Sequence, residues 1–363
     1  TRVGQGGWIS KPRAGIKSDA VFTASPDSAG PPDGYASEAR RIRMGVEGDI
    51  AGGFGYRMEV DFADGGAELY DAVLTYADRG LSVAIGHQNN FQGLEELSSS
   101  LFSSFIERAA FTDAFGFERR LGVSAQYQRG DLLIQSGVFG DNAATRANKS
   151  WSADGRAVFA PKLGEARLHL GGSAHFTKLN DSTDSIRYRQ RPFVHFSDER
   201  YINTGLFSAR SELGLGLETA VTAGPLHAVA EGFWQKVDRP EDLASPTFFG
   251  GYAEIGYFLA RGDTRGYKGG RFDRVSPARP VGKGGLGAVQ VNLRYDRLDL
   301  TDAGINGGTQ DGYGLSLVWT PTAYTRLMAS YMHLDYNGAF YAIPGNIRSY
   351  DVDAFGMRAQ IDF

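Results

Sequence analysis

The chain contains no cysteine among its 363 residues, which excludes disulfide bridges, thiol catalysis and cysteine-based metal sites. It also lacks any apolar run of about 18 residues, so no transmembrane helix is expected. The histidines and carboxylates show no metal-ligand spacing, and we expect neither a metal site nor a cofactor. No charged segment followed by an apolar core begins the chain; we expect that export, if it occurs, involved a signal peptide ahead of Thr1.

What the sequence does have is alternation. The last nine residues, Phe355 to Phe363, alternate between apolar side chains and small or polar ones. Successive side chains of a strand point to opposite faces, so this strand has one apolar and one polar face. Its terminal phenylalanine resembles the ending of bacterial outer-membrane barrels. For this strand alone, the edge of a soluble sandwich is the default interpretation, and the rest of the chain has to decide.

The same two-residue period recurs along the whole chain and predicts an all-β fold. It predicts about 16 antiparallel strands, an even number as in bacterial single-chain transmembrane barrels. The predicted strands are 13–23, 40–50, 54–62, 68–77, 81–90, 119–129, 131–140, 152–161, 166–177, 206–222, 225–237, 247–260, 284–300, 311–321, 325–336 and 354–363. A barrel of this size leaves an aqueous lumen, and we expect the polar faces to line it.

The predicted connections alternate between short turns rich in Gly or Pro and longer segments. Short turns on one side and long loops on the other are typical of periplasmic turns and external loops. The long connections are 24–39, 91–118, 141–151, 178–205, 301–310 and 337–353. One long segment, 261–283, falls on the side of the short turns, and an exception of this kind is often functional. No linker divides the chain, so 1–363 is predicted to be a single barrel domain.

Three connections have unusual chemistry and are predicted to fold into the lumen: 91–118, 178–205 and 261–283. The first is apolar and rich in serine, and packing on neighbouring external loops is the alternative. The other two are basic; they carry Arg187, Arg189, Arg191 and Arg200, and Arg261, Arg265, Lys268 and Arg271, respectively. Rings of Arg and Lys in a pore select anions, although a charge run is also compatible with a solvated surface. Arg41, Arg43 and Arg57, on the polar faces of predicted strands, would extend the path.

Short motifs spread over most of the chain resemble the phosphate-selective porin O/P family. They are Arg40-Arg-Ile-Arg-Met-Gly-Val-Glu-Gly48, Tyr70-Asp-Ala-Val-Leu-Thr-Tyr76, Gly93-Leu-Glu-Glu-Leu-Ser-Ser-Ser100, Ile106-Glu-Arg108, Arg119-Arg-Leu-Gly-Val123 and Gly256-Tyr-Phe-Leu-Ala-Arg261. The resemblance implies a homotrimer in the bacterial outer membrane, with three segments of each chain folded into its pore. By position it implies a constriction made of Arg41, Asp71, Ser99, Ser100 and Arg108. Glu96 stands where phosphate-selective members carry a lysine, so the substrate does not follow from the family.

The predicted function is therefore an outer-membrane porin through which small solutes diffuse passively, with a preference for phosphate or other small anions. The alternative is a general or sugar-type diffusion porin, in which Glu59, Asp61, Asp71 and Glu96 offset the arginines. A barrel enzyme would need Ser, His and an acid converging near a rim, and no nucleophile motif lies beside the histidines, so an enzyme is not expected. The expected partners are membrane lipid, lipopolysaccharide and small anions, and not nucleic acid.

Overall fold

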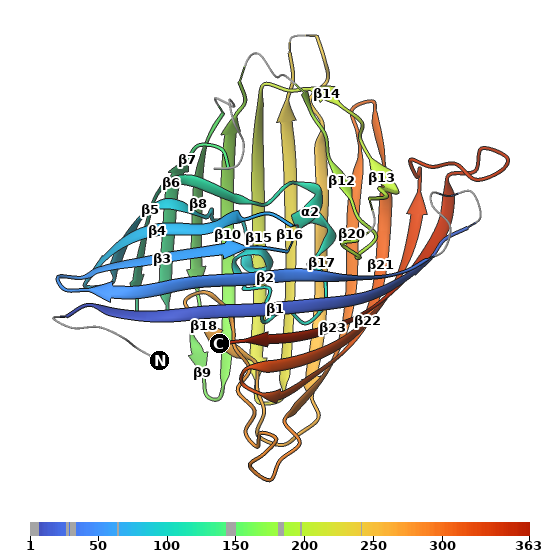
Figure 1. Cartoon of the computed structure of the whole chain (residues 1–363). Coiled ribbons are helices and arrows are strands. Elements are labelled where there is room, and N and C mark those ends of the chain that lie inside the picture. The colour runs from blue at the N-terminus through green and yellow to red at the C-terminus, as the bar shows by residue number, and fades with distance from the viewer. Residues whose placement is uncertain are drawn as a thin grey trace.

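The computed structural model describes residues 7–26, 29, 34–63, 65–142, 150–180, 185–196, 198–240 and 242–363. They form one closed barrel of 16 antiparallel strands (Figure 1). The strands are β1 (Ile9–Ala24), β2 (Gly34–Ile50), β3 (Phe54–Asp61), β4 (Glu68–Asp78), β5 (Leu81–Asn89), β6 (Arg119–Arg129), β7 (Leu132–Phe139), β8 (Trp151–Phe159), β10 (Ala166–Lys178), β15 (Ser211–Ala223), β16 (Leu226–Asp238), β17 (Thr247–Phe258), β20 (Ala288–Asp302), β21 (Ile305–Thr322), β22 (Thr325–Asn337) and β23 (Ser349–Asp362). A two-residue strand, β9 (Lys162–Leu163), follows β8 and also pairs with β10. The predicted fold is confirmed.

The barrel closes between its first and last strands. β1 pairs with β23 from Gly15 opposite Asp362 to Ala24 opposite Asp353. Beyond that register, the backbones of Ala14 and Phe363 exchange two hydrogen bonds of 3.2 and 3.0 Å. Closure pairs the backbone groups of a strand that would otherwise form an exposed edge. The apolar alternation at the C-terminus therefore belongs to a barrel wall rather than to the edge of a sandwich.

The two faces of the wall differ as the alternation predicts. On β20, Leu293 and Tyr295 are exposed on the outside, whereas Arg294 between them is 4% exposed and points inward. On β23, Met357 is exposed and Arg358 is buried. The outer face is thus apolar and the inner face polar. Among the described residues, no helix is long and apolar enough to cross a membrane.

Several predicted boundaries were wrong. The predicted long connection 301–310 is strand, because β20 and β21 continue to a tight turn at Ala303 and Gly304. Both turn residues have positive φ, 50° and 81°, which matches the twist of a two-residue hairpin. The predicted strand 206–222 begins only at Ser211, since β14 (Phe207–Ser208) pairs with β11 (Ser185–Ile186) outside the barrel wall.

Three connections carry elements of their own. The inner loop, residues 90–118 between β5 and β6, contains α1 (Leu94–Leu97) and α2 (Ala110–Ala114), and α2 lies within the ring of strands (Figure 1). The upper insertion, residues 179–210, contains β11 and β14 and also pairs β12 (Arg189–Gln190) with β13 (Ile202–Asn203). The turn-side hairpin, residues 259–287, pairs β18 (Gly266–Lys268) with β19 (Arg271–Asp273).

The buried core lies inside the barrel, between the inner loop and one half of the wall. Phe111 of α2 is 1% exposed and stacks on Phe233 of β16 and Tyr252 of β17. Leu94 of α1 is fully buried in the same cluster. The inner loop therefore fills the half of the lumen bounded by β15–β23 and leaves open space on the side of β2–β7.

Candidate pore constriction

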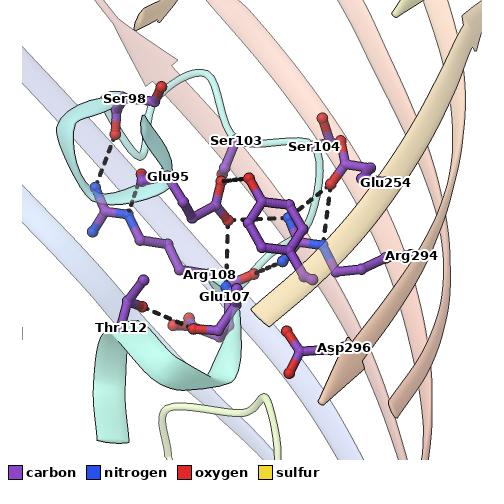
Figure 2. A network of polar contacts seen from close by, with 12 residues as sticks. Glu95, Ser98, Ser103, Ser104, Glu107, Arg108, Thr112, Glu254, Arg294 and Asp296 are labelled. Carbon is purple, nitrogen blue, oxygen red and sulfur yellow. Dashed lines mark hydrogen bonds and ion pairs between the residues drawn. The ribbon is translucent and has the colours of Figure 1, made fainter. Parts of the chain in front are cut away.

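The inner loop is held against the wall by a buried ion network (Figure 2). Arg294 of β20 donates from Nη2 to Glu254 Oε2 at 2.7 Å and to Glu95 Oε1 at 3.0 Å. Glu95 Oε1 in turn accepts the backbone N–H of Ala109 at 3.3 Å, so one side chain joins α1 to the start of α2. Removing one partner from such a buried network leaves an uncompensated charge, which is strongly destabilising.

Wall carboxylates also accept the free N–H groups at the start of both helices. Glu231 of β16 accepts from Leu94 at 2.8 Å and from Glu95 at 2.7 Å. Asp296 of β20 accepts from Ala110 at 3.1 Å. The first N–H groups of a helix have no partner within the helix, and these side-chain oxygens supply one. Residues far away in sequence therefore position two very short helices.

Arginines of the last strands bind carbonyl groups of the inner loop. Arg326 of β22 donates to the carbonyl oxygens of Leu101 at 2.9 Å and of Ser103 at 2.5 Å. Arg358 of β23 donates to the carbonyl oxygen of Ile106 at 2.7 Å. This corrects the expectation that all polar wall faces line water. On β20–β23 many of them lie beneath the inner loop, where Asn292 has no exposed surface.

Arg108 and Glu96 form an ion pair within the loop itself. Arg108 Nη1 lies 3.1 Å from Glu96 Oε2, and the guanidinium donates to the backbone oxygens of Glu95, Glu96 and Ser98. Arg108 thus holds the first turn of the loop in place while part of its side chain faces the lumen. Burial raises the pKa of Glu96, and the Arg108 charge opposes this shift without cancelling it.

Two β-bulges direct adjacent side chains into the lumen at the level of this loop. Between β1 and β2, Lys17 pairs with Arg41 and Asp19 with Glu38, so two residues of β2 oppose one of β1. Arg40 and Arg41 consequently both line the lumen. Bulges of this kind redirect side chains and are common beside functional sites.

A second bulge shapes β4. Glu59 pairs with Asp71 and Val60 with Leu69, which leaves Tyr70 as the extra residue. The Tyr70 ring lies between two guanidinium groups, with Arg43 at 3.1 Å and Arg119 at 3.3 Å from its centroid. Planar guanidinium groups stack favourably on aromatic faces. The stack is part of the barrel wall, and its Arg119 lines the lower of the two cavities described below.

Each stacked arginine is also paired with an acid. Arg43 Nε lies 2.7 Å from Asp61 Oδ2, and Arg119 Nε lies 2.8 Å from Asp71 Oδ1. Arg40 pairs more loosely with Glu107, at 3.4 Å. Burial alone would raise the pKa of Glu107, but the charges of Arg40 and Arg358 hold it at about 2. The constriction is therefore rich in cations whose field is partly neutralised.

Two cavities lie along the lumen. The upper cavity, of about 150 Å³, is lined by Arg40, Arg41, Arg108 and Arg191 and by the acids Glu96, Glu107 and Asp113. The lower cavity, of about 470 Å³, is lined by Lys11, Arg57, Arg119 and Arg271 and by the acids Glu47, Asp49 and Asp71. In each of them basic residues outnumber acidic ones by four to three.

The structure places several predicted residues elsewhere. Ser100 accepts two hydrogen bonds from Lys17 Nζ, through its carbonyl oxygen at 2.7 Å and its hydroxyl at 2.9 Å. These two atoms are therefore not open to a solute. The Ser99 hydroxyl accepts the backbone N–H of Leu101 at 3.3 Å within the loop. Arg187, Arg261 and Lys268 are exposed and do not line either cavity.

The remaining predicted arginines also lie away from the two cavities. Arg265 is 5% exposed and stacks over Phe272 at 4.7 Å. Arg200 is buried in the upper insertion, where burial lowers its pKa. Arg189 is half-buried on β12.

Five further residues of this region were not predicted from the sequence: Lys17, Arg40, Tyr70, Glu107 and Arg119. Lys17 had a usable signal, because it lies on the polar face of the first predicted strand. The others depend on a bulge or on loop geometry, which leave no period in the sequence.

Residues 13–363 match the family described as phosphate-selective porin O and P. An uncharacterised protein of Caulobacter vibrioides is 47% identical over 342 residues, which covers 91% of this chain and 69% of that protein.

Two solved structures share the fold at low sequence identity. OmpT of Vibrio cholerae has a TM-score of 0.62 at 11% identity and covers 100% of both chains. An anion-selective porin from Comamonas acidovorans has a TM-score of 0.61 at 12% identity and covers 98% of this chain and 100% of that one. The predicted family and membrane are thereby confirmed: this chain belongs to the phosphate-selective porin O and P family and is a porin of the bacterial outer membrane.

Proposed function

We propose that this porin passes small solutes by passive diffusion and prefers anions. The observation that carries the proposal is the path of cations from the upper cavity, past the Arg43–Tyr70–Arg119 stack, to the lower cavity. Rings of basic side chains in a narrow lumen select anions, and low-dielectric walls strengthen their field. The family description and the anion-selective porin of Comamonas acidovorans agree with this preference.

The acidic partners make the preference moderate. Asp61, Asp71 and Glu107 each neutralise part of an arginine at the candidate constriction. This pairing favours the second candidate function, a general diffusion porin with little selectivity. The two proposals differ in the sign and size of one quantity, the reversal potential in a salt gradient.

In a KCl gradient, we expect the reversal potential of wild-type channels to have the sign that shows that chloride passes more easily than potassium. Replacing both Arg41 and Arg57 with Gln should move that potential toward cation preference, since both side chains line cavities in the lumen. Arg79→Gln is the control, because its side chain is 93% exposed on a turn, where salt screens its charge. A wild-type channel that passes potassium better than chloride would contradict the proposal.

Anion preference should rise as the pH falls from 7 toward the range in which glutamate takes up protons. Burial raises the pKa of Glu96, so this carboxyl takes up a proton at a higher pH than an ordinary glutamate, and the constriction loses a negative charge. Glu107 keeps its charge over this range because its pKa is about 2. Reversal potentials at several pH values measure the change, and Glu96→Gln should flatten it. An equally steep pH dependence in that variant would assign the effect to another group.

We further propose that the channel is a homotrimer in contact with lipid and lipopolysaccharide. A solved trimer form of Vibrio cholerae OmpT shares the fold. Near the loop-side ends of β22 and β23, His333, Asp335 and Asp351 place ligand atoms within 4.8 Å of one another, a grouping that sequence spacing did not reveal. Acidic groups near the loop-side ends of the strands suit divalent cations that bridge to phosphate groups of lipopolysaccharide. The mass of the detergent-solubilised protein distinguishes a trimer from a monomer.

We propose no catalytic activity for the barrel. His175 contacts Asp154 and also lies 2.9 Å from the Thr177 hydroxyl, an order of groups seen in hydrolases. Thr177 is only 2% exposed, however, and the second Asp154 oxygen accepts the backbone N–H of Phe91 at 3.0 Å. These contacts support a structural role in which the three residues fix the start of the inner loop.

A further inference from the structure

The lower cavity has two walls of different chemistry. Its volume of about 470 Å³ lies within the range of about 300–1,000 Å³ that is typical of small-molecule sites. Strands β2–β4 line one side with charged residues. On the other side, β5–β7 present mainly uncharged side chains that form hydrogen bonds; the exception is Arg119 at the start of β6, which is paired with Asp71. An aqueous conduit for inorganic ions has no need of such a difference.

The uncharged wall has hydrogen-bonding groups to spare. Gln126 accepts from Gln135 Nε2 at 3.2 Å through its oxygen, which leaves its own amide N–H groups for a solute. Ser82 lines the same wall. Asn89 also lines this wall. Amides and hydroxyls that both donate and accept are suited to the hydroxyl groups of a solute.

The charged wall presents two guanidinium groups. The Arg57 side chain is 43% exposed, and its contacts with Glu47 and Asp71 are both 3.6 Å, too long for direct hydrogen bonds. Arg271, from the turn-side hairpin, lines the same cavity, and no carboxylate in the described part of the chain lies within ion-pair distance of it. Arg271 is exposed on the hairpin, yet partial desolvation in the lumen lowers its pKa and the nearby charge of Arg57 lowers it further, so the two cations repel each other. An anion between them would relieve that repulsion.

We infer that the lower cavity is a subsite for hydroxylated organic anions of monosaccharide size, such as a sugar acid. The carboxylate lies between Arg57 and Arg271, and the hydroxyl groups lie against Ser82, Asn89 and Gln126. Arginine forks match carboxylate oxygens well. A neutral sugar leaves the arginines without a counter-ion, and a small inorganic anion leaves the amide wall unused. This inference rests on the proposed anion preference and names a solute class for it.

The test is block of the chloride current through single reconstituted channels by added glucuronate, glucose or acetate. We expect glucuronate to half-block the current at a concentration at least tenfold lower than either glucose or acetate. Glucose has the hydroxyls without the charge, and acetate has the charge without the hydroxyls. Arg57→Gln and Arg271→Gln should reduce the advantage of glucuronate over glucose. Gln126→Leu should reduce its advantage over acetate, and Arg79→Gln should change neither.

The outcomes separate this inference from the proposed function. Glucuronate block no stronger than acetate block, in a channel whose reversal potential favours chloride, overturns the subsite alone. Strong glucuronate block in a channel that prefers potassium contradicts only the general anion preference. If Arg271→Gln fails to fold, which heat-dependent gel mobility reveals, Arg57→Gln and Gln126→Leu still decide the question. Unchanged ratios in both of those variants would overturn the assignment.

Discussion

Replacing Arg294 with Met is expected to release the inner loop and to destabilise the barrel by about 3–5 kcal/mol. Arg294 is the cation shared by Glu254 and Glu95, and its side chain is 1% exposed. Without it, two buried carboxylates lose their counter-charge, and the contact between the loop and β20 is lost. The measurements are unfolding in denaturant and single-channel conductance, which should become larger and noisier.

Arg297→Met is the matched control, three residues along the same strand. Its side chain is 39% exposed on the outer face and pairs with Asp311 at 2.8 Å. Exposed pairs of this kind contribute about 0–1 kcal/mol. If both variants lost the same stability, or if conductance through Arg294→Met channels were quiet and unchanged, the wall would not hold the loop through this network.

The neighbouring substitution, Leu293→Arg, should fail for a different reason. Leu293 is 55% exposed on the outer, apolar face of β20. Arginine at a lipid-facing position near the membrane midplane costs about 2–4 kcal/mol. We expect a smaller fraction of heat-modifiable, folded protein after insertion into lipid vesicles.

Ser82→Arg provides the comparison for Leu293→Arg, because Ser82 lines the open lower cavity. An arginine there is able to keep its water, and insertion should be close to that of the wild type. Equal insertion of the two variants would mean that the outer face of β20 does not contact lipid.

Strand number, direction and facing were predictable because a period of two persists through most of the wall. Leu293 and Arg294 are an example: one side chain is apolar and the next is charged, and this difference indicates which face of the strand is outside. The tight turn at Ala303 and Gly304 was missed because the residues around it are polar, as in a loop. Alternation within a strand involves only neighbouring residues, so it is visible in a single sequence.

The constriction was less predictable because it is made by departures from that period. Arg40 and Arg41 share the lumen, and Tyr70 lies between two arginines, only because bulges shift the pairing. No residue type marks either bulge. The role of Glu231 as a partner for the start of α1 depends on a contact across 136 or more residues of sequence. Composition indicated that charge lies in the lumen; it did not indicate which charges face water and which hold the loop.

The placement of those wall carboxylates has a consequence for biogenesis. The backbone groups of Leu94 and Ala110 precede their acceptors, Glu231 and Asp296, by 137 and 186 residues. The inner loop therefore has no fixed position until most of the barrel has been delivered to the membrane. We expect the lumen to remain wide during assembly and to narrow only when the late strands arrive. The inner loop then limits permeability only in the completed barrel, from the step in which the last strands close it.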